Sequence, residues 1–148
     1  MKTHRLHSEL RIERPVEELF RFFSEPRNLQ VITPPWLHLE VVSATTPSIR
    51  AGTEIDYRLR MRGIPMRWRS RISVWEPPLR FVDEQVAGPY RRWRHVHSFE
   101  PEGEATIARD DVEYAAWGGP LVRLLVAPEL ERVFAYRRHA LSEIFRGS

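Results

Sequence analysis

The sequence contains no cysteine, which excludes disulfide bonds and thiolate chemistry. It also lacks an N-terminal signal pattern and any apolar run of about 18 residues, the length that a membrane-spanning helix requires. We therefore expect a soluble, cytoplasmic protein without integral membrane association.

Lysine is almost absent, because Lys2 is the only one and the other basic residues are arginines. The formal net charge is only +3, so the high isoelectric point of about 9.8 says little about partners. No repeat, low-complexity tract or linker divides the 148 residues, a length that suits one domain, 1–148. Composition leaves a monomer and a homodimer both open.

Proline is abundant, and its twelve copies punctuate short elements and argue against a helical bundle. Residues 3–13 alternate well enough for a first strand. After Trp36, apolar residues recur with period two in six further segments between glycine or proline turns, which predicts an antiparallel meander. These segments are residues 37–46, 53–61, 65–76, 80–87, 89–100 and 104–116.

Three segments have helical spacing instead. Residues 15–23 begin with proline, which suits a first helical turn, and a second short helix is expected between Pro26 and Pro34. A long C-terminal helix is predicted after Pro120, with a kink near Pro128. Its apolar stripe consists of Leu121, Leu124, Leu125, Leu130, Val133, Phe134, Leu141, Ile144 and Phe145.

This order of elements predicts an α+β fold. A curved seven-stranded antiparallel sheet wraps around the long C-terminal helix, and two short helices follow strand 1. A strongly curved sheet leaves a gap beneath such a helix, whereas a flat sheet would pack directly on it. The gap is the predicted binding site.

Motifs along nearly the whole chain form a further pattern. They are residues 15–20, 28–29, 33–36, 75–78, 80–85 and 95–99, together with the arginine-rich final helix. This set resembles the START/Bet v 1-like (SRPBCC) superfamily, in particular its bacterial polyketide cyclase/dehydrase-like branch. The resemblance implies the helix-grip fold. It does not imply one activity, because members bind lipids, hormones, polyketides or quinones, some cyclise or dehydrate them, and others are cochaperone-like or ribosome-associated.

The strand at residues 90–99 is the most informative segment for function. Alternate residues of a strand share a face, so the bulky apolar rings of Trp93 and Phe99 indicate the inward face. That face carries Arg91, Trp93, His95, His97 and Phe99, a set typical of a cavity wall. The opposite face is expected to carry Tyr90, Arg92, Arg94 and Ser98.

A hairpin through the turn at Gly103 predicts that His95 lies opposite Asp110. A histidine held by a carboxylate can move a proton near neutral pH, so these two residues are the candidate catalytic pair. The alternative is that the pair only stabilises the hairpin. The same pairing sets Trp93 opposite Val112 and Arg91 opposite Tyr114.

Further side chains of the predicted wall would contact a ligand. Asp83 and Gln85 share a face with Phe81 on the neighbouring strand, where they would hold hydroxyl or carbonyl groups. The complete set of candidate ligand-binding residues is Tyr57, Trp68, Asp83, Gln85, Arg91, Trp93, His97 and Tyr114.

The spacing of polar residues favours an organic ligand over a metal. His95, His97 and Asp110 match the two-imidazole, one-carboxylate set of some metal sites. Alternate residues of a strand lie about 7 Å apart, so the imidazoles would need convergent rotamers. The resembling families are generally metal-free, and we expect neither a metal nor a cofactor.

The outer face of the predicted sheet is rich in arginine. It carries Arg58, Arg60, Arg62, Arg67, Arg69, Arg71, Arg92 and Arg94, with Glu84, Asp111 and Glu113 to neutralise part of it. A solvated lattice of salt bridges is one interpretation, and an anion-binding surface for RNA, ribosome or acidic lipid is the other. Few aromatic residues accompany the arginines, so nucleic acid is not the expected partner.

The function predicted from the sequence is binding of a hydrophobic small molecule, such as a lipid, polyketide or other ring compound, between the sheet and the C-terminal helix. A cofactor-free cyclase or dehydratase that uses His95 and Asp110 is the alternative. Partner binding through the arginine face is a third hypothesis. The identity of the ligand stays open.

Overall fold

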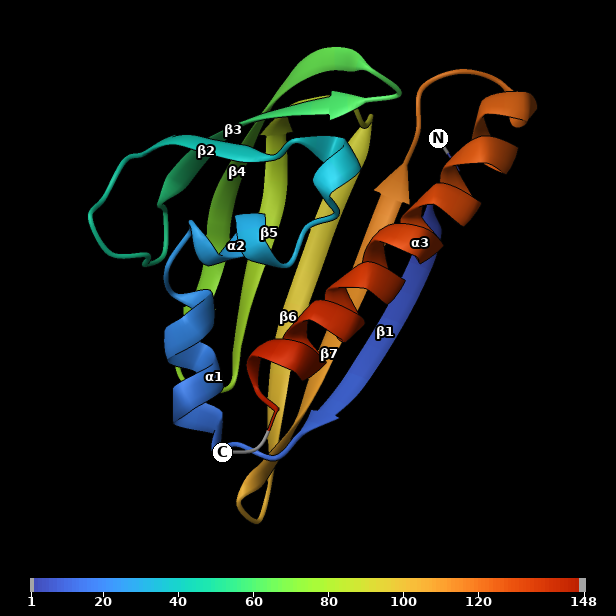
Figure 1. The fold of residues 1–148 in the computed structure, drawn as a ribbon. Coiled ribbons are helices and arrows are strands. Elements are labelled where there is room, and N and C mark those ends of the chain that lie inside the picture. The colour runs from blue at the N-terminus through green and yellow to red at the C-terminus, as the bar shows by residue number, and fades with distance from the viewer. Residues whose placement is uncertain (1, 147–148) are drawn as a thin grey trace.

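The computed structural model describes residues 2–146, and its centre is one curved antiparallel sheet (Figure 1). The strands lie in the order β1-β7-β6-β5-β4-β3-β2, so β2 to β7 follow one another as neighbours and β1 adds beside β7. They are β1 (His4–Ile12), β2 (Glu40–Ala44), β3 (Glu54–Met61), β4 (Ile64–Glu76), β5 (Arg80–Ala87), β6 (Arg92–Glu102) and β7 (Ala105–Ala115).

The helices lie on one face of this sheet. α1 (Val16–Phe23), α2 (Asn28–Val31) and the 3-10 turn η1 (Pro35–Leu37) cover one half of it (Figure 1). The long helix α3 (Pro120–Ile144) crosses β6, β7 and β1 in the other half. The predicted order of elements and the helix-grip architecture are confirmed.

Two strands begin three residues later than predicted. β2 begins at Glu40 and not at residue 37, because the chain after Pro34 forms a 3-10 turn. β6 begins at Arg92 and not at residue 89. Tyr90 therefore precedes the strand, and the alternation of inward-facing and outward-facing side chains does not extend to it. It is buried, although the sequence pattern placed it on the outer face.

The apolar stripe of α3 is buried only along part of the helix. The buried members include Leu130, Phe134 and Leu141. The exposed members are Leu124, Leu125 and Ile144, which corrects the predicted stripe. In the view of Figure 1, the first turns of α3 extend past the end of β7. The helix continues through Pro128, and the side chain of Leu121 lies outside the described residues.

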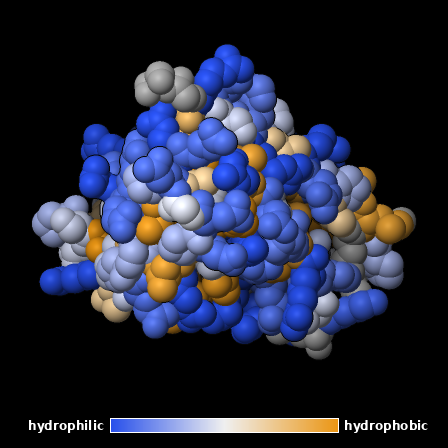
Figure 2. Space-filling model, turned by 90° about the horizontal axis from the view of Figure 1, so that it is seen from below, coloured by the Kyte–Doolittle hydropathy of each residue, from blue (hydrophilic) through white to orange (hydrophobic). Residues whose placement is uncertain are grey.

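The end of the molecule that carries the β6–β7 turn has a predominantly polar surface. Seen from that end, exposed hydrophobic residues form small, separate patches among hydrophilic ones (Figure 2). Within residues 2–146, no helix combines the length and the apolar character that crossing a membrane requires. The buried apolar side chains lie mainly on the inner face of the sheet.

Candidate ligand-binding site

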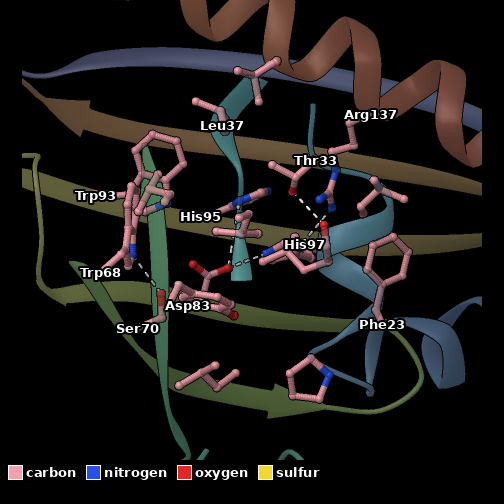
Figure 3. Close-up of a pocket in the computed structure, with 18 of the residues that line it drawn as sticks. Phe23, Thr33, Leu37, Trp68, Ser70, Asp83, Trp93, His95, His97 and Arg137 are labelled. Atoms are coloured by element: carbon pink, nitrogen blue, oxygen red, sulfur yellow. Dashed lines mark hydrogen bonds and ion pairs between the residues drawn. The ribbon is translucent and has the colours of Figure 1, made fainter. Parts of the chain in front are cut away.

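A cavity of about 190 Å³ lies between the inner face of the sheet and the helices. One water molecule needs about 10–15 Å³ on a comparable measure, so a small organic molecule has room here. The wall is mainly apolar and aromatic, and its polar members include one cluster of titratable side chains. The labelled side chains include Phe23, Trp68 and Trp93 on the apolar side, and Asp83, His95, His97 and Arg137 in the polar group (Figure 3).

β6 brings the two histidines to this cavity. The predicted alternation is confirmed, because Trp93, His95, His97 and Phe99 are all buried. The predicted cross-strand pairing is wrong by two residues. The turn has Gly103 at a positive φ of 62°, and it sets His97, not His95, opposite Asp110.

The contact between His95 and Asp110 nevertheless exists. Asp110 Oδ1 lies 2.8 Å from His95 Nε2, across a diagonal of the sheet. Diagonal neighbours on adjacent strands are within reach of long side chains. The predicted pair of Trp93 shifts in the same way, so that Trp93, and not Arg91, lies opposite Tyr114.

Five titratable side chains form one buried network. Arg137 Nε and Nη2 donate to the two oxygens of Asp110 at 3.1 and 3.0 Å. Arg137 Nη2 also lies 3.3 Å from His97 Nδ1, and His97 Nε2 bonds to Asp83 Oδ2. The rings of His95 and His97 stack with their centroids 3.6 Å apart (Figure 3). The network thus runs from Asp83 on β5, through β6, to β7 and α3.

The hydrogen bonds define where the protons of both imidazoles lie. A guanidinium only donates, so His97 Nδ1 carries a lone pair and Nε2 carries the proton that it donates to Asp83. Burial, assisted by His95, lowers the pKa of His97 to about 4, and the ring is neutral at pH 7. A carboxylate only accepts, so His95 donates from Nε2 to Asp110. In the neutral ring, His95 Nδ1 is then a free lone pair.

Both carboxyl groups are ionised. Burial alone would raise the pKa of Asp110, but Arg137 and the hydrogen bond from His95 hold it well below its usual range. Burial likewise opposes ionisation of Asp83, and the hydrogen bond from His97 outweighs it and lowers the pKa. Two carboxylates and one guanidinium leave the network with a net charge of about −1 when both imidazoles are neutral.

Arg137 is a site residue that the sequence analysis missed. It is only 5% exposed and lies on the buried stripe of α3, three residues after Phe134 and four before Leu141. A charged residue in the middle of an apolar helical stripe is a signal of a buried ion pair. Tyr90, which also lines the cavity, carried no such signal because it lies outside the regular strand.

Six predicted site residues line the cavity. They are Tyr57, Trp68, Asp83, Trp93, His95 and His97. Asp110 is not among the described residues that line the cavity, and it bonds to both His95 and Arg137. These seven side chains are brought together as the sequence analysis expected, by strands β3 to β7.

Three predicted ligand contacts lie elsewhere, as judged from the described residues that line the cavity. Arg91 precedes β6 and is exposed, with its guanidinium over the ring of Trp117. The Gln85 amide bonds to the backbone N–H and C=O of Tyr90 and so closes the β5–β6 connection. Tyr114 packs in an apolar cluster on the inner face, beside the cavity wall.

The geometry also brings together a potential set of metal ligands. Asp83, His95 and His97 each offer an atom within 4.8 Å of the others, so Asp83 takes the place that the sequence analysis gave to Asp110. A metal on His97 Nε2 would displace its proton to Nδ1, which would then face the N–H of Arg137. The hydrogen bonds of His97 therefore disfavour a metal at these groups.

The arginines of the outer face are largely paired with acids. Arg58 and Arg67 do lie opposite each other, as expected from the turn at Gly63. The ion pairs include Arg58 with Glu40, Arg69 with Asp56, Arg71 with Glu54, Arg92 with Glu113 and Arg94 with Glu84. This pattern favours the interpretation of a solvated salt-bridge lattice.

The curved sheet, the gripped helix and the internal cavity define a helix-grip protein of the START/Bet v 1-like class. The chain belongs to the family described as polyketide cyclase/dehydrase and lipid transport, whose model matches residues 12–141. No curated protein is significantly similar to the sequence.

Solved structures share this fold at low sequence identity. Norcoclaurine synthase from Thalictrum flavum has a TM-score of 0.72 at 16% identity, over 99% of this chain and 96% of that one. The protein TTHA0849 from Thermus thermophilus has a TM-score of 0.68 at 22% identity, over 95% of each chain. Major latex-like protein 151 from Panax ginseng has a TM-score of 0.69 at 12% identity, over 97% and 98%. These similarities establish the fold alone.

Proposed function

We propose that this protein binds a hydrophobic small molecule, such as a lipid, polyketide or other ring compound, in the cavity beneath α3. The observation that carries the proposal is the mainly apolar cavity of about 190 Å³. Family membership supports binding of a hydrophobic ligand in general terms. A norcoclaurine synthase structure that shares the fold holds dopamine and hydroxybenzaldehyde, two small aromatic compounds.

The energetics of packing favour an occupant. Protein interiors are close-packed, and a void deprives its lining atoms of dispersion contacts. A ligand restores these contacts and removes its own apolar surface from water, at about 25 cal/mol per Å². The polar group of Asp83, His95 and His97 would then fix the orientation of the ligand.

Filling the cavity tests this proposal. Leu59 lines it, and Leu59→Trp puts an indole into the space. Val42→Trp is the matched control, because it adds the same indole at a half-exposed position on β2. The probe is the neutral fluorophore N-phenyl-1-naphthylamine, titrated into each folded protein. We expect L59W to weaken its binding by about tenfold or more and V42W to leave it unchanged. Equal binding by all three proteins would contradict the proposal.

A second candidate function is acid–base catalysis by His95, as in a cofactor-free cyclase or dehydratase. The specific observation is that His95 Nε2 is held by Asp110, while Nδ1 makes no hydrogen bond within residues 2–146 and belongs to a ring that lines the cavity. Asp110 orients the ring through the hydrogen bond from Nε2. Removal of a C–H proton is a step that aldol cyclisation and dehydration share.

A generic proton-abstraction substrate tests the second candidate. In 5-nitrobenzisoxazole, removal of the C3 proton by a base breaks the N–O bond and releases a coloured phenolate. We expect His95→Gln to lower the rate of turnover by about 100-fold, since general-base catalysis supplies at least that factor. His139→Gln, at an exposed position on α3, is the control. Turnover that is equal in wild type and H95Q would retire the catalytic proposal and leave ligand binding intact.

A further inference from the structure

The charged side chains that line the cavity are mostly acidic. Glu25, Asp83 and Glu129 contribute carboxylates, and Arg137 is the one arginine or lysine among the described lining residues. Arg137 is already engaged by Asp110. The carboxylate of Asp110 thus largely compensates the positive charge of Arg137, which leaves little net positive charge at this part of the cavity wall.

The three carboxylates that line the cavity differ in the groups that compensate their negative charge. Glu129 lies 3.6 Å from the guanidinium of Arg62, and Glu25 is exposed to water. Asp83 has no arginine or lysine in direct contact within the described part of the chain. Its partner is His97, which is neutral because its other nitrogen accepts from Arg137. Asp83 is therefore the one inner carboxylate without a full counter-charge.

Asp83 also has an unused acceptor. The hydrogen bond from His97 goes to Oδ2, and Oδ1 accepts none from residues 2–146. The side chain keeps 17% of its surface accessible while lining the cavity. In the neutral ring, His95 Nδ1, 3.9 Å from Asp83 Oδ2, is a second free acceptor. A buried charge without a partner is unfavourable, so this corner requires a donor, best a positively charged one.

The apolar side of the cavity suits a cation as well. The indoles of Trp68 and Trp93 lie edge to face with centroids 5.2 Å apart, and Tyr57 completes this wall. Aromatic faces attract ammonium groups, and they also pack against the ring or chain that carries the ammonium. Figure 3 shows the two indoles and Asp83 around the same space.

We propose that the ligand is an amine: a hydrophobic body that fills the aromatic part of the cavity and carries a protonated amino group that bonds to Asp83 Oδ1 and His95 Nδ1. This inference rests on the proposed binding function and narrows its ligand class. A carboxylate ligand would face Asp83 directly, and repulsion would weaken its binding. A neutral alcohol would satisfy the acceptor but not the charge.

A series of probes with one body tests the inference. The compounds are 1-naphthylmethylamine, 1-naphthylmethanol and 1-naphthoic acid, whose affinities are measured at pH 7 by calorimetry or by quenching of tryptophan fluorescence. On the wild-type protein, we expect the amine to bind about tenfold tighter than the alcohol, and the acid to bind weaker than both. Equal affinities for amine and alcohol would overturn the amine proposal and leave the binding function standing. No binding by any of the three compounds would overturn both.

Asp83→Asn identifies the group responsible. The amide oxygen can still accept from His97, so the variant removes the charge and preserves the hydrogen bond. We expect D83N to lower affinity for the amine to that of the alcohol, with affinity for the alcohol unchanged. Asp56→Asn is the matched control, since Asp56 pairs with Arg69 on the outer face. An amine preference that survives in D83N would contradict the assignment.

A metal cation is the competing occupant of the same corner. Zinc chloride is therefore titrated in the presence of the bound amine. We expect Zn²⁺ not to displace the amine, because His97 Nε2 stays protonated and donates a hydrogen bond to Asp83. Stoichiometric displacement of the amine by Zn²⁺ would show that Asp83, His95 and His97 form a metal site, and would overturn the amine proposal. If D83N does not fold, the ranking of the three ligands on the wild-type protein still decides the matter.

Discussion

Asp110 is a buried carboxylate whose ionised state depends on Arg137. The guanidinium donates to both of its oxygens, and both side chains are buried. Removing one partner of a buried ion pair leaves the other charge unpaired, which costs about 3–5 kcal/mol. The stability of the fold around β7 thus depends on Arg137 of α3.

We predict that Arg137→Met lowers the free energy of unfolding by about 3–5 kcal/mol, as measured by urea denaturation. Arg132→Met, at an exposed position on the same helix, should change it by less than about 0.5 kcal/mol. The double variant Arg137→Met with Asp110→Asn should recover part of the loss, because the second substitution removes the carboxylate that the first leaves unpaired. Equal effects of R137M and R132M would show that the buried pair is not important for stability.

His97 makes stability depend on pH. Its pKa is about 4 in the folded protein and 6.5 in an unconstrained chain, so below pH 6.5 the unfolded state takes up more protons than the folded state. The free energy of unfolding therefore falls as the pH drops from 6.5 to 4. The lowered pKa values of Asp83 and Asp110 extend the loss to more acidic pH.

We predict a decrease of up to about 3 kcal/mol from His97 between pH 7 and pH 4, measured by denaturation at a series of pH values. His97→Gln, which cannot take up this proton, should remove that part of the slope. His139→Gln should keep it, since His139 is exposed. A slope that is unchanged in H97Q would assign the acid sensitivity to other groups.

At the residue scale, the sequence predicted most of the polar site. Alternation along one strand is enough to assign Trp93, His95 and His97 to the inner face. The contact of His95 with Asp110 was expected, although from a strand register that is wrong by two residues. The role of Arg137 was not predicted. Its place in the apolar stripe of α3 indicates burial, but no local pattern in the chain identifies Asp110 on β7 as its partner.

At the scale of elements, α3 is anchored by its second half. Leu141 is 2% exposed and packs in the main apolar cluster, whereas Leu124 is 71% exposed. Both residues belong to the same apolar stripe in the sequence, and only the position of the helix on the sheet distinguishes them. Helical periodicity thus identifies the stripe without identifying its buried part.

We predict that Leu141→Ala destabilises the protein by about 2–5 kcal/mol, because it deletes buried methyl groups and leaves a cavity. Leu124→Ala should change stability by less than about 0.5 kcal/mol, since its side chain already contacts water. Thermal and chemical denaturation of both variants measure this difference. A large loss in L124A would mean that the first turns of α3 are covered in solution.

At the scale of the whole molecule, the cavity couples ligand binding to stability. A ligand that binds only the folded state at 100 times its dissociation constant adds about 2.7 kcal/mol. We predict that 1-naphthylmethanol or N-phenyl-1-naphthylamine raises the melting temperature in a concentration-dependent manner, by on the order of 5–10 °C. L59W should show no such increase, and a ligand-independent melting temperature in the wild type would argue against an internal binding site.

The order of elements, the antiparallel meander and the inner face of β6 could all be predicted from the sequence. These features follow from hydrophobic periodicity and from glycine and proline turns, which are local properties of the chain. The strand register, the burial of Arg137 and the position of Arg91 outside the cavity could be seen only in the folded structure. These three features depend on how the curvature of the sheet and the crossing of α3 bring together residues that are far apart in the sequence. The spacing of residues along the chain does not specify such contacts.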